Sequence, residues 1–378
     1  MKIGLVSEFF YPTLGGVQEH LYNVAKQYIK KGHSTSIITP RVFTRTPFEQ
    51  WWPKDLPKET YVPVGYSFPY FVNDSRARIC AGFGLGRRLR HLLTPENYDI
   101  IHLHAPLNGI LPILADHFCS TNLVGTFHTS FPGSKVLSLF RSMAQRQLDN
   151  LDSIIGVSPI AIESMEPYVN IKAQVISNGI DTTYFRPLSE VPGGRLKEFD
   201  NDRPKIVFVG RPDSRNGLDT LITAFGKVVK TFPKALLIIA GGGSEMKRYQ
   251  DMCKFLPEHS VRFLGQVRDE RADVYRSGDI HVFGVEKATF SITVLEGMAS
   301  GLPVVTTPFK GYEALGEAGK HFLTVPFGDA DALAVNLEDL IRNPEKRTRL
   351  GQEARKHSLN FDWSIVADRV LEVYKSVL

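Results

Sequence analysis

One order of secondary-structure elements occurs twice along this chain, and it restricts the possible fold more than any other feature. The apolar run KIGLVS at residues 2–7 predicts a buried strand, and a glycine loop follows it. PTLGGVQEHLYNVAKQYIKKGH then carries apolar residues at helical spacing, and STSIITP predicts the next strand. A strand, loop, helix and strand in this order is typical of a parallel sheet covered by helices.

The same order begins again past residue 200, with PKIVFVG, RPDSRNG, LDTLITAFGKVVKTF and ALLIIAGGG. Between the two copies, residues 186–204 are rich in Pro, Gly and charge and show no period, which indicates a linker. The chain of 378 residues is long enough for two domains. We therefore predict an α/β protein of two doubly wound, Rossmann-like domains that face each other across a cleft. The predicted domains are residues 1–190 and 200–360, and an amphipathic helix at 361–378 follows them.

Composition argues against a disulfide-stabilised protein and against a protein that spans a membrane. The cysteines are three in number and scattered, without disulfide or zinc spacing, which favours a reducing cytosol. No apolar run reaches the roughly 18 residues that a membrane span needs. The net charge of +5 suits a phosphate-bearing ligand or an anionic membrane surface.

Three loops that follow predicted strands have residues suited to phosphate. Gly15 and Gly16 stand just before a helix, where the backbone can approach an anion, although a tight turn would use them equally. Arg211 follows a strand directly and would grip phosphate in a bidentate manner, or lie free on the surface. The glycines of AGGGSE, residues 240–245, are ambiguous in the same way.

Histidines and aspartates offer weaker signals. His128 follows the apolar run NLVG and is a candidate donor, acceptor or structural side chain. His102 and His104 alternate on one strand face, but the sequence shows no third metal ligand beside them. The acidic pair in DAD, residues 329–331, precedes an apolar run and predicts a helix N-cap in preference to a metal site.

Taken together, these stretches resemble the family-four retaining glycosyltransferases of GT-B fold, with bacterial phosphatidylinositol mannosyltransferases as the nearest pattern. The resemblance covers nearly the whole chain, and it rests on the order and spacing of GGVQEH, TFHTSF, GVSP, SNGID, FVGRPDSRNGL, RFLGQV, LEGMASGLPVV and FDWS. It implies that the last helix crosses back onto the N-terminal domain. It also implies a nucleotide sugar as co-substrate, with no cofactor and no metal.

The resemblance assigns roles to individual residues. His128, Arg211 and Glu296 would be the catalytic set: His128 would hydrogen-bond the donor sugar, Arg211 would bind the diphosphate, and Glu296 would accept hydrogen bonds from the ribose. The remaining donor-binding candidates are Gly15 and Gly16 at the phosphates, Gly243 and Val267 near the base, and the backbone amides of Phe290, Ser291 and Ile292 at the distal phosphate.

Two donor-site positions depart from the family pattern. Asn216 stands where the family usually has Lys, and Ala288 stands where it usually has the first Glu of an E-x7-E pair. Each lost charged hydrogen bond is worth roughly 1.5–3 kcal/mol. Arg215 and Glu286 are the neighbours that would compensate.

The acceptor side is predicted from a basic stretch. Residues 73–93 place five arginines near one apolar helix, which suits an anionic membrane surface or a solvated helix face. The resemblance makes Arg78 the best candidate for an acceptor phosphate, with Gln18 and Asn73 as further candidates. The pair Trp51 and Trp52 would either anchor at the membrane interface or pack under a loop.

The sequence thus predicts a retaining hexosyltransferase that moves mannose from GDP-mannose to a lipid-linked or polyol-phosphate acceptor such as phosphatidylinositol. It would be cytoplasmic, peripheral on the inner face of the plasma membrane, and without a nucleic-acid partner. Two alternatives stay open: a UDP-sugar donor with another lipid or glycan acceptor, and a catalytically degenerate binding protein.

Overall fold

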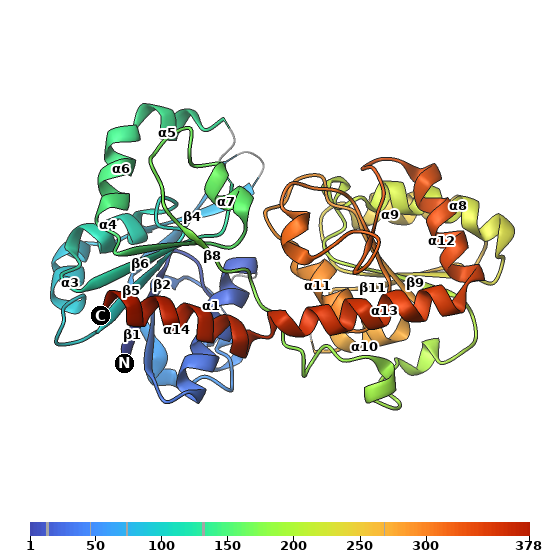
Figure 1. The fold of residues 1–378 in the computed structure, drawn as a ribbon, viewed down its shortest axis with the longest axis horizontal. Helices are drawn as coiled ribbons and strands as arrows, with labels where there is room; N and C mark the ends of the chain where they lie inside the picture. The colour runs from blue at the N-terminus through green and yellow to red at the C-terminus, as the bar shows by residue number, and fades with distance from the viewer. Residues whose placement is uncertain (13–14, 46, 73–74, 131–132, 268) are drawn as a thin grey trace. The chain divides into compact units, whose positions relative to one another are not determined.

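The computed structural model describes residues 1–12, 15–45, 47–72, 75–130, 133–267 and 269–378. The chain divides into two compact units. The first unit comprises residues 1–178 and 363–378, and the second unit comprises residues 179–362. Each is an α/β unit built on one sheet, which confirms the predicted fold class (Figure 1).

The first unit contains an eight-stranded sheet in the order β4-β3-β2-β1-β5-β6-β7-β8. Every neighbouring pair is parallel except β3 and β4. Its strands are β1 (Lys2–Ser7), β2 (Ser34–Val42), β3 (Tyr61–Val72), β4 (Ser75–Ala81), β5 (Ile100–His104), β6 (Asn122–Phe127), β7 (Ser153–Gly156) and β8 (Gln174–Val175). Its helices are α1 (Gly16–Lys30), α2 (Phe48–Trp51), α3 (Leu85–Leu92), α4 (Ile110–Phe118), α5 (Lys135–Leu139), α6 (Arg141–Asp149), α7 (Pro159–Glu163) and α14 (Trp363–Val377).

The second unit contains a six-stranded parallel sheet in the order β11-β10-β9-β12-β13-β14. Its strands are β9 (Lys205–Val209), β10 (Leu236–Ala240), β11 (Val261–Gly265), β12 (Ile280–Phe283), β13 (Val304–Thr306) and β14 (Leu323–Thr324). Its helices are α8 (Leu218–Thr231), α9 (Met246–Met252), α10 (Arg271–Ser277), α11 (Ile292–Ala299), α12 (Ala330–Arg342) and α13 (Pro344–Ser358). The central strands β9 and β10 are buried at every residue, as expected for a parallel sheet covered on both faces.

The final helix, α14, packs on α1 within the first unit, although the two are about 340 residues apart in sequence (Figure 1). The rings of Tyr28 and Tyr374 meet edge to face at 5.8 Å, and their hydroxyls lie 3.3 Å apart. Both side chains are fully buried, so this contact belongs to the core of the first unit.

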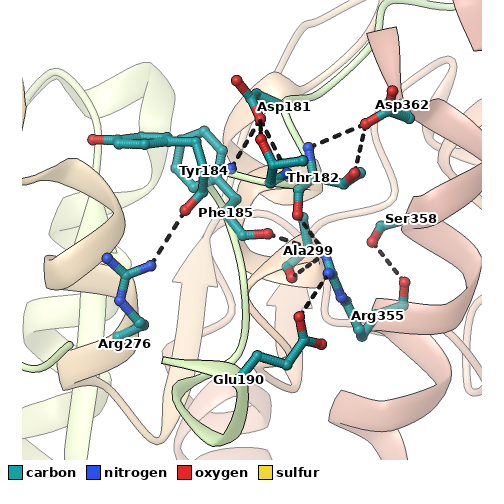
Figure 2. Close-up of polar contacts among 11 residues, drawn as sticks. Asp181, Thr182, Tyr184, Phe185, Glu190, Arg276, Ala299, Arg355, Ser358 and Asp362 are labelled. Atoms are coloured by element: carbon teal, nitrogen blue, oxygen red, sulfur yellow. Dashed lines mark hydrogen bonds and ion pairs between the residues drawn. The ribbon is translucent and has the colours of Figure 1, made fainter. Parts of the chain in front are cut away.

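The stretch predicted as a linker belongs to the second unit. Figure 2 shows how the chain just before this stretch is held: Arg355 of α13 donates to the carbonyl oxygens of Thr182 and Phe185, and to that of Ala299, at 3.0 to 3.2 Å. The same guanidinium reaches the Glu190 carboxylate at 3.2 Å. Within the stretch, the Gly194 carbonyl accepts from the Arg276 guanidinium at 3.0 Å. The chain therefore passes between the units at residues 178–179 and again at 362–363, and not at residues 190–200. A stretch without periodicity is ordered here because distant side chains satisfy its backbone carbonyls.

The prediction of one helix near residues 73–93 was wrong. Residues 75–81 form β4, an edge strand paired antiparallel to β3, and only Leu85–Leu92 is helical. Arg76 and Arg78 are two residues apart, which is the period of a strand, and the partner that stabilises the strand lies in β3. In contrast, the predicted N-cap at Asp329 is confirmed, since its carboxylate accepts from the Ala332 N–H at 2.8 Å.

Candidate active site

The first unit has a topological switch point between β1 and β5. The chain leaves β1 toward β2 on one side, whereas β5 is followed by β6 on the other side. Ligands of open α/β sheets bind outside the carboxyl ends of strands at such a point. Ser7 and His104 are register partners at these ends, and Ala105 follows with φ of 58°, a left-handed conformation that is uncommon for a residue with a side chain.

The glycine loop after β1 leads into α1. Gly15 is the N-cap residue, and its carbonyl accepts from the Glu19 N–H at 3.1 Å. Gly15 and Gly16 are exposed, whereas Gln18 is buried. A Cβ at position 15 would lie 2.7 Å from the Gln18 amide oxygen, so the loop leaves room for backbone but not for a side chain. The arrangement suits close approach of an anion to this helix start, as predicted.

His128 follows β6 and meets two other imidazoles. Its Nε2 lies 3.0 Å from Nδ1 of His104, and its ring packs edge to face on His20 with centroids 4.8 Å apart. All three rings are buried. Desolvation lowers the pKa of His20 to about 4 and holds the pKa values of His104 and His128 well below 6.5. At neutral pH these are neutral imidazoles, which exchange hydrogen bonds with a ligand but bring no positive charge.

The predicted donor residues of the second unit gather at the carboxyl edge of its sheet. Arg211 follows β9 and is exposed, Gly243 follows β10, and Val267 follows β11. The loops after β9 and β10 touch, because a Cβ on Gly241 would lie 1.8 Å from the Gly210 carbonyl oxygen. Only glycine permits this approach, and Gly241 also has φ of 153°.

Asn216 and Arg215 end the loop after β9, in a short 3-10 turn (Ser214–Asn216). The Asn216 amide donates to the Arg211 carbonyl at 2.9 Å and so fixes the loop instead of offering a charge. The Arg215 guanidinium is held by both carboxylate oxygens of Asp213, at 3.0 and 2.7 Å. In this arrangement Arg215 is engaged within its own loop, so it does not stand in for a lysine at position 216.

Ala288 lies in the loop between β12 and α11, half-buried against the core of the second unit. Glu286 joins this loop to the previous one, because its N–H donates to the Arg215 carbonyl at 3.0 Å. Phe290, Ser291 and Ile292 then begin α11, with the Ser291 hydroxyl accepting from the Val294 N–H at 3.3 Å. The Glu286 carboxylate is about half exposed and is available to move.

Glu296 is buried and bound to other side chains of the second unit, which the sequence did not indicate. It lies on α11 with 3 % of its side chain exposed. One carboxylate oxygen is 3.1 Å from the Arg271 guanidinium, and the other accepts from the Tyr275 hydroxyl at 2.7 Å. A carboxylate has about four acceptor positions, so two bound donors leave capacity for ribose hydroxyls. Arg271 and Tyr275 were not identified from the sequence. Their one signal is that they stand at positions i and i+4 of α10, which puts them on the same side of this helix.

A small pocket lies at the same edge of the second sheet. It is lined by Gly217 and Gly284, next to the loops of Asn216 and Ala288, and by residues at the ends of β12, β13 and β14, namely Val282, Thr307 and Val325. Its walls are mainly glycine backbone and aliphatic side chains. The two departures from the family pattern therefore flank one pocket.

Of the predicted acceptor residues, the structure places Arg78 and Gln18 on different elements of the first unit. Arg78 is on β4, where its guanidinium donates to the Ser67 hydroxyl at 2.6 Å and to the Ser67 carbonyl at 3.2 Å. Gln18 is buried under the glycine loop, and Asn73 lies outside the described residues. Of the helices that the structure describes, none is both long enough and apolar enough to cross a membrane.

Exposed aromatic side chains occur on both sides of the β3–β4 pair. Tyr66 and Phe68 on β3 contact Phe43, with ring centroids 5.3 and 5.9 Å from it, and all three are exposed. The register of β3 and β4 puts Tyr66 and Phe68 on the sheet face opposite to Arg78. Phe83 is fully exposed just before α3, whose exposed face carries Arg87, Arg88 and Arg90. We call Phe83, Arg87, Arg88 and Arg90 the aromatic–basic face. The tryptophan pair is not part of it: Trp52 is 5 % exposed and packs against Phe48 and Tyr61.

Both parts of the chain match known family models. Residues 14–184 match the model described as Glycosyltransferase Family 4, and residues 195–357 match Glycosyl transferases group 1. The solved structure of Anabaena HepE in complex with UDP superposes with a TM-score of 0.77 at 19% identity, covering 100% of both chains. This likeness, together with the two parallel sheets, establishes the GT-B fold.

Curated relatives extend over the full length. The phosphatidyl-myo-inositol mannosyltransferase of Mycobacterium leprae is 30% identical over 380 residues, covering 100% of this chain and 97% of that protein. The phosphatidylinositol N-acetylglucosaminyltransferase GPI3 subunit of Saccharomyces cerevisiae is 26% identical, covering 100% of this chain and 83% of that protein. The chain belongs to the family-four glycosyltransferases and is a hexosyltransferase.

Proposed function

We propose that this enzyme transfers mannose from GDP-mannose to the inositol of a phosphatidylinositol-type acceptor, with retention of the anomeric configuration. The observation that carries the proposal is the end-to-end match with a phosphatidyl-myo-inositol mannosyltransferase at 30% identity. The glycine loop before α1 and the exposed Arg211 beyond β9 supply groups that bind phosphate.

Each of the predicted site residues has a distinct task in this proposal. Arg211 binds the diphosphate and stabilises the charge that develops on it as the sugar departs. The amides at the start of α11 hold the distal phosphate, and the Glu296 carboxylate, which Arg271 and Tyr275 orient, accepts from the ribose. The neutral His128 imidazole hydrogen-bonds the sugar. The donor phosphate receives the acceptor proton, so no protein nucleophile is required.

The aromatic–basic face supports a lipid-linked acceptor. Arginines attract anionic headgroups, and exposed aromatic side chains settle at the membrane interface. The bonds of Arg78 to Ser67 hold its guanidinium in a defined position. The enzyme would work as a peripheral protein on an anionic membrane surface, on the cytoplasmic side.

Thermal unfolding with nucleotides tests the donor. A ligand at about 100 times its dissociation constant adds roughly 2.7 kcal/mol of stability. We expect GDP to raise the melting temperature and GDP-mannose to raise it further, with UDP and ADP as matched controls. A rise in melting temperature with UDP alone would indicate that the donor is a UDP-sugar and not GDP-mannose.

A transfer assay tests the acceptor. Radiolabelled mannose from GDP-mannose should enter the lipid fraction with phosphatidylinositol vesicles and should not with phosphatidylglycerol vesicles of the same charge. The face is tested by sedimentation: Phe83→Ser with Arg87→Gln and Arg88→Gln should release the enzyme from anionic vesicles at low salt. Equal binding by this variant would remove the membrane proposal and leave the transfer proposal standing.

A UDP-sugar donor is the second candidate. It is supported by the fold of HepE, solved with UDP, and by the yeast relative, whose name specifies an N-acetylglucosaminyl group. A catalytically degenerate binding protein would bind nucleotide and transfer no sugar from any donor. The transfer assay with GDP- and UDP-sugars in parallel separates these outcomes.

A further inference from the structure

Three imidazoles from separate elements of the first unit meet in one place. His20 comes from α1, His104 from the end of β5, and His128 from the segment after β6. Each offers one ring nitrogen, and these nitrogens all lie within 4.8 Å of one another. His20 is 2 %, His104 1 % and His128 8 % exposed, so the group is enclosed, with His128 its most open member. Imidazole nitrogen is a preferred ligand for Zn²⁺.

One pair of these nitrogens is already close to the spacing that a metal ion requires. His104 Nδ1 and His128 Nε2 are 3.0 Å apart. Two ligand atoms on a tetrahedral Zn²⁺, each at about 2.0–2.1 Å from the ion, stand about 3.3 Å apart. Small ring rotations would therefore replace this hydrogen bond by two metal bonds. The other nitrogen of His104, Nε2, is buried without a hydrogen-bond partner. The cluster thus contains polar capacity that the protein itself does not use.

The surroundings resemble the outer shell of a metal site. His20 Nδ1 lies 2.9 Å from the amide oxygen of Asn178, and ligating histidines usually donate their second N–H to such an oxygen. Trp363 covers the His20 ring edge to face at 5.3 Å. His102 is close to His104, but both its nitrogens are bound, to Tyr374 and Thr126 at 2.6 Å each. Three ligands are therefore available and a fourth position stays open, as in zinc sites that admit a water or substrate.

We propose that His20, His104 and His128 form a binding site for one divalent transition-metal ion, Zn²⁺ being the best fit. Metal at this site withdraws His128 from the donor sugar and makes Zn²⁺ an inhibitor competitive with the sugar nucleotide. The inhibition rests on the proposed function, whereas the metal site rests on the geometry alone.

Cobalt titration of the metal-stripped full chain tests the site. Co²⁺ bound by three imidazoles in a four-coordinate site absorbs in the visible region, and Zn²⁺ should displace it. We expect one Co²⁺ per chain and quenching of the fluorescence of Trp363, which lies against His20. His104→Gln should lower the Co²⁺ affinity at least 100-fold, and Asn178→Ala should lower it about 10- to 100-fold, as removal of an outer-shell partner does.

The matched control is His321→Gln. His321 stacks on His357 in the second unit at 3.9 Å, so this pair is the competing histidine site among the described residues. Co²⁺ binding should be unchanged in this variant. Tryptophan fluorescence of the metal-free variants verifies folding of the first unit, and His20→Gln serves as a second ligand variant should His104→Gln unfold.

No visible band, or a band that survives in both ligand variants, would overturn the site. A band that disappears in His321→Gln would move it to the second unit. If Co²⁺ binds as expected but Zn²⁺ does not weaken GDP-mannose binding, the site stands and its link to His128 is overturned. If no sugar nucleotide binds at all, the proposed function fails, while the cobalt titration still decides the metal site.

Discussion

The two units repeat one strand–loop–helix plan (Figure 1), but the buried polar groups at the carboxyl edges of their sheets are accommodated differently. At the carboxyl edge of the first sheet, buried imidazoles stay neutral, because burial lowers the pKa of His20 to about 4 and of His102 to about 3. At the edge of the second sheet, Glu296 is just as deeply buried and stands opposite Arg271. At these two edges, neutrality offsets desolvation in the first unit and pairing offsets it in the second. His281 within β12 of the second unit is also held neutral, because burial lowers its pKa to about 4.

The same fold can therefore make two kinds of ligand contact. Neutral imidazoles suit hydroxyl groups, such as those of a sugar, since they exchange hydrogen bonds without attracting anions. The exposed Arg211 and the start of α11 suit phosphates.

Acidification should unfold the first unit before it unfolds the second unit. His20, His102, His104 and His128 have pKa values below the unfolded value of about 6.5. Below pH 6.5 the unfolded chain binds protons that the folded chain excludes, so stability falls as the pH falls. Each such histidine then costs about 2 kcal/mol at pH 5.

Two buried carboxyls of the first unit oppose this loss. Burial raises the pKa of Glu8 to about 7 and of Asp116 to about 6, so these groups favour the folded state as the pH falls. The net loss in the first unit should still be several kcal/mol. All three tryptophans lie in the first unit, so their fluorescence during urea unfolding at pH 7 and pH 5 reports it selectively. Equal loss in both units, judged against far-UV circular dichroism, would contradict the contrast.

Arg271→Ala should destabilise the second unit by about 2–3 kcal/mol, because it leaves the Glu296 carboxylate buried without its charged partner. Circular dichroism during urea unfolding should show the change, and tryptophan fluorescence should not. Adding Glu296→Gln should recover most of the loss. Arg262→Ala, which breaks the exposed pair with Glu198, should change stability by less than about 0.5 kcal/mol. A similar loss in the control would mean that the burial of Glu296 is not the cause.

Arg211→Ala should reduce kcat/KM for sugar transfer about 100-fold, because a charge-assisted bond to the leaving diphosphate is lost. Folding stability should hardly change, since Arg211 is exposed. Arg215→Ala is the matched variant, and its effect should stay small because Asp213 already holds that guanidinium. A loss of equal size in Arg215→Ala would show that Arg215 leaves Asp213 to serve the donor.

Ala288→Glu should strengthen sugar-nucleotide binding about 10-fold relative to the nucleotide alone, the gain from one charged hydrogen bond to a sugar hydroxyl. Calorimetry with both ligands measures it, and Ala288→Gln tests whether charge is needed. Asn216→Lys combined with Ala288→Glu extends the test to transfer. If an inactive enzyme stayed inactive in this double variant, loss of these two donor-site groups would not be the reason for inactivity.

Much of the fold was predictable because periodicity is local. The runs at β1, β2, β9 and β10 and the stripes of α1 and α8 lie where the sequence predicted them. Two stretches were predicted wrongly, because the residues that contact them lie far away in the sequence. Residues 75–81 form a strand because β3 pairs with them, and residues 186–190 belong to the second unit because Arg355 binds their neighbourhood.

The candidate site also combines residues that the sequence predicted with residues that it did not. The stretch GGVQEH contained His20, and HLH contained His104, but neither indicated a meeting with His128. In the second unit the sequence predicted Glu296, while its partners Arg271 and Tyr275 went unrecognised. These residues are 21 to 108 positions apart from the residues they meet, and no local signal spans that separation.

The two α/β units, the strands and helices of their repeated plan, the phosphate-suited loops and the family were predictable from the sequence alone. Side-chain spacing follows the geometry of the backbone within each element, so these features can be read locally. Only the tertiary structure decided that three imidazoles share one enclosed space and that Glu296 is paired. Those facts depend on strand order and register, which bring together carboxyl ends that the chain visits far apart.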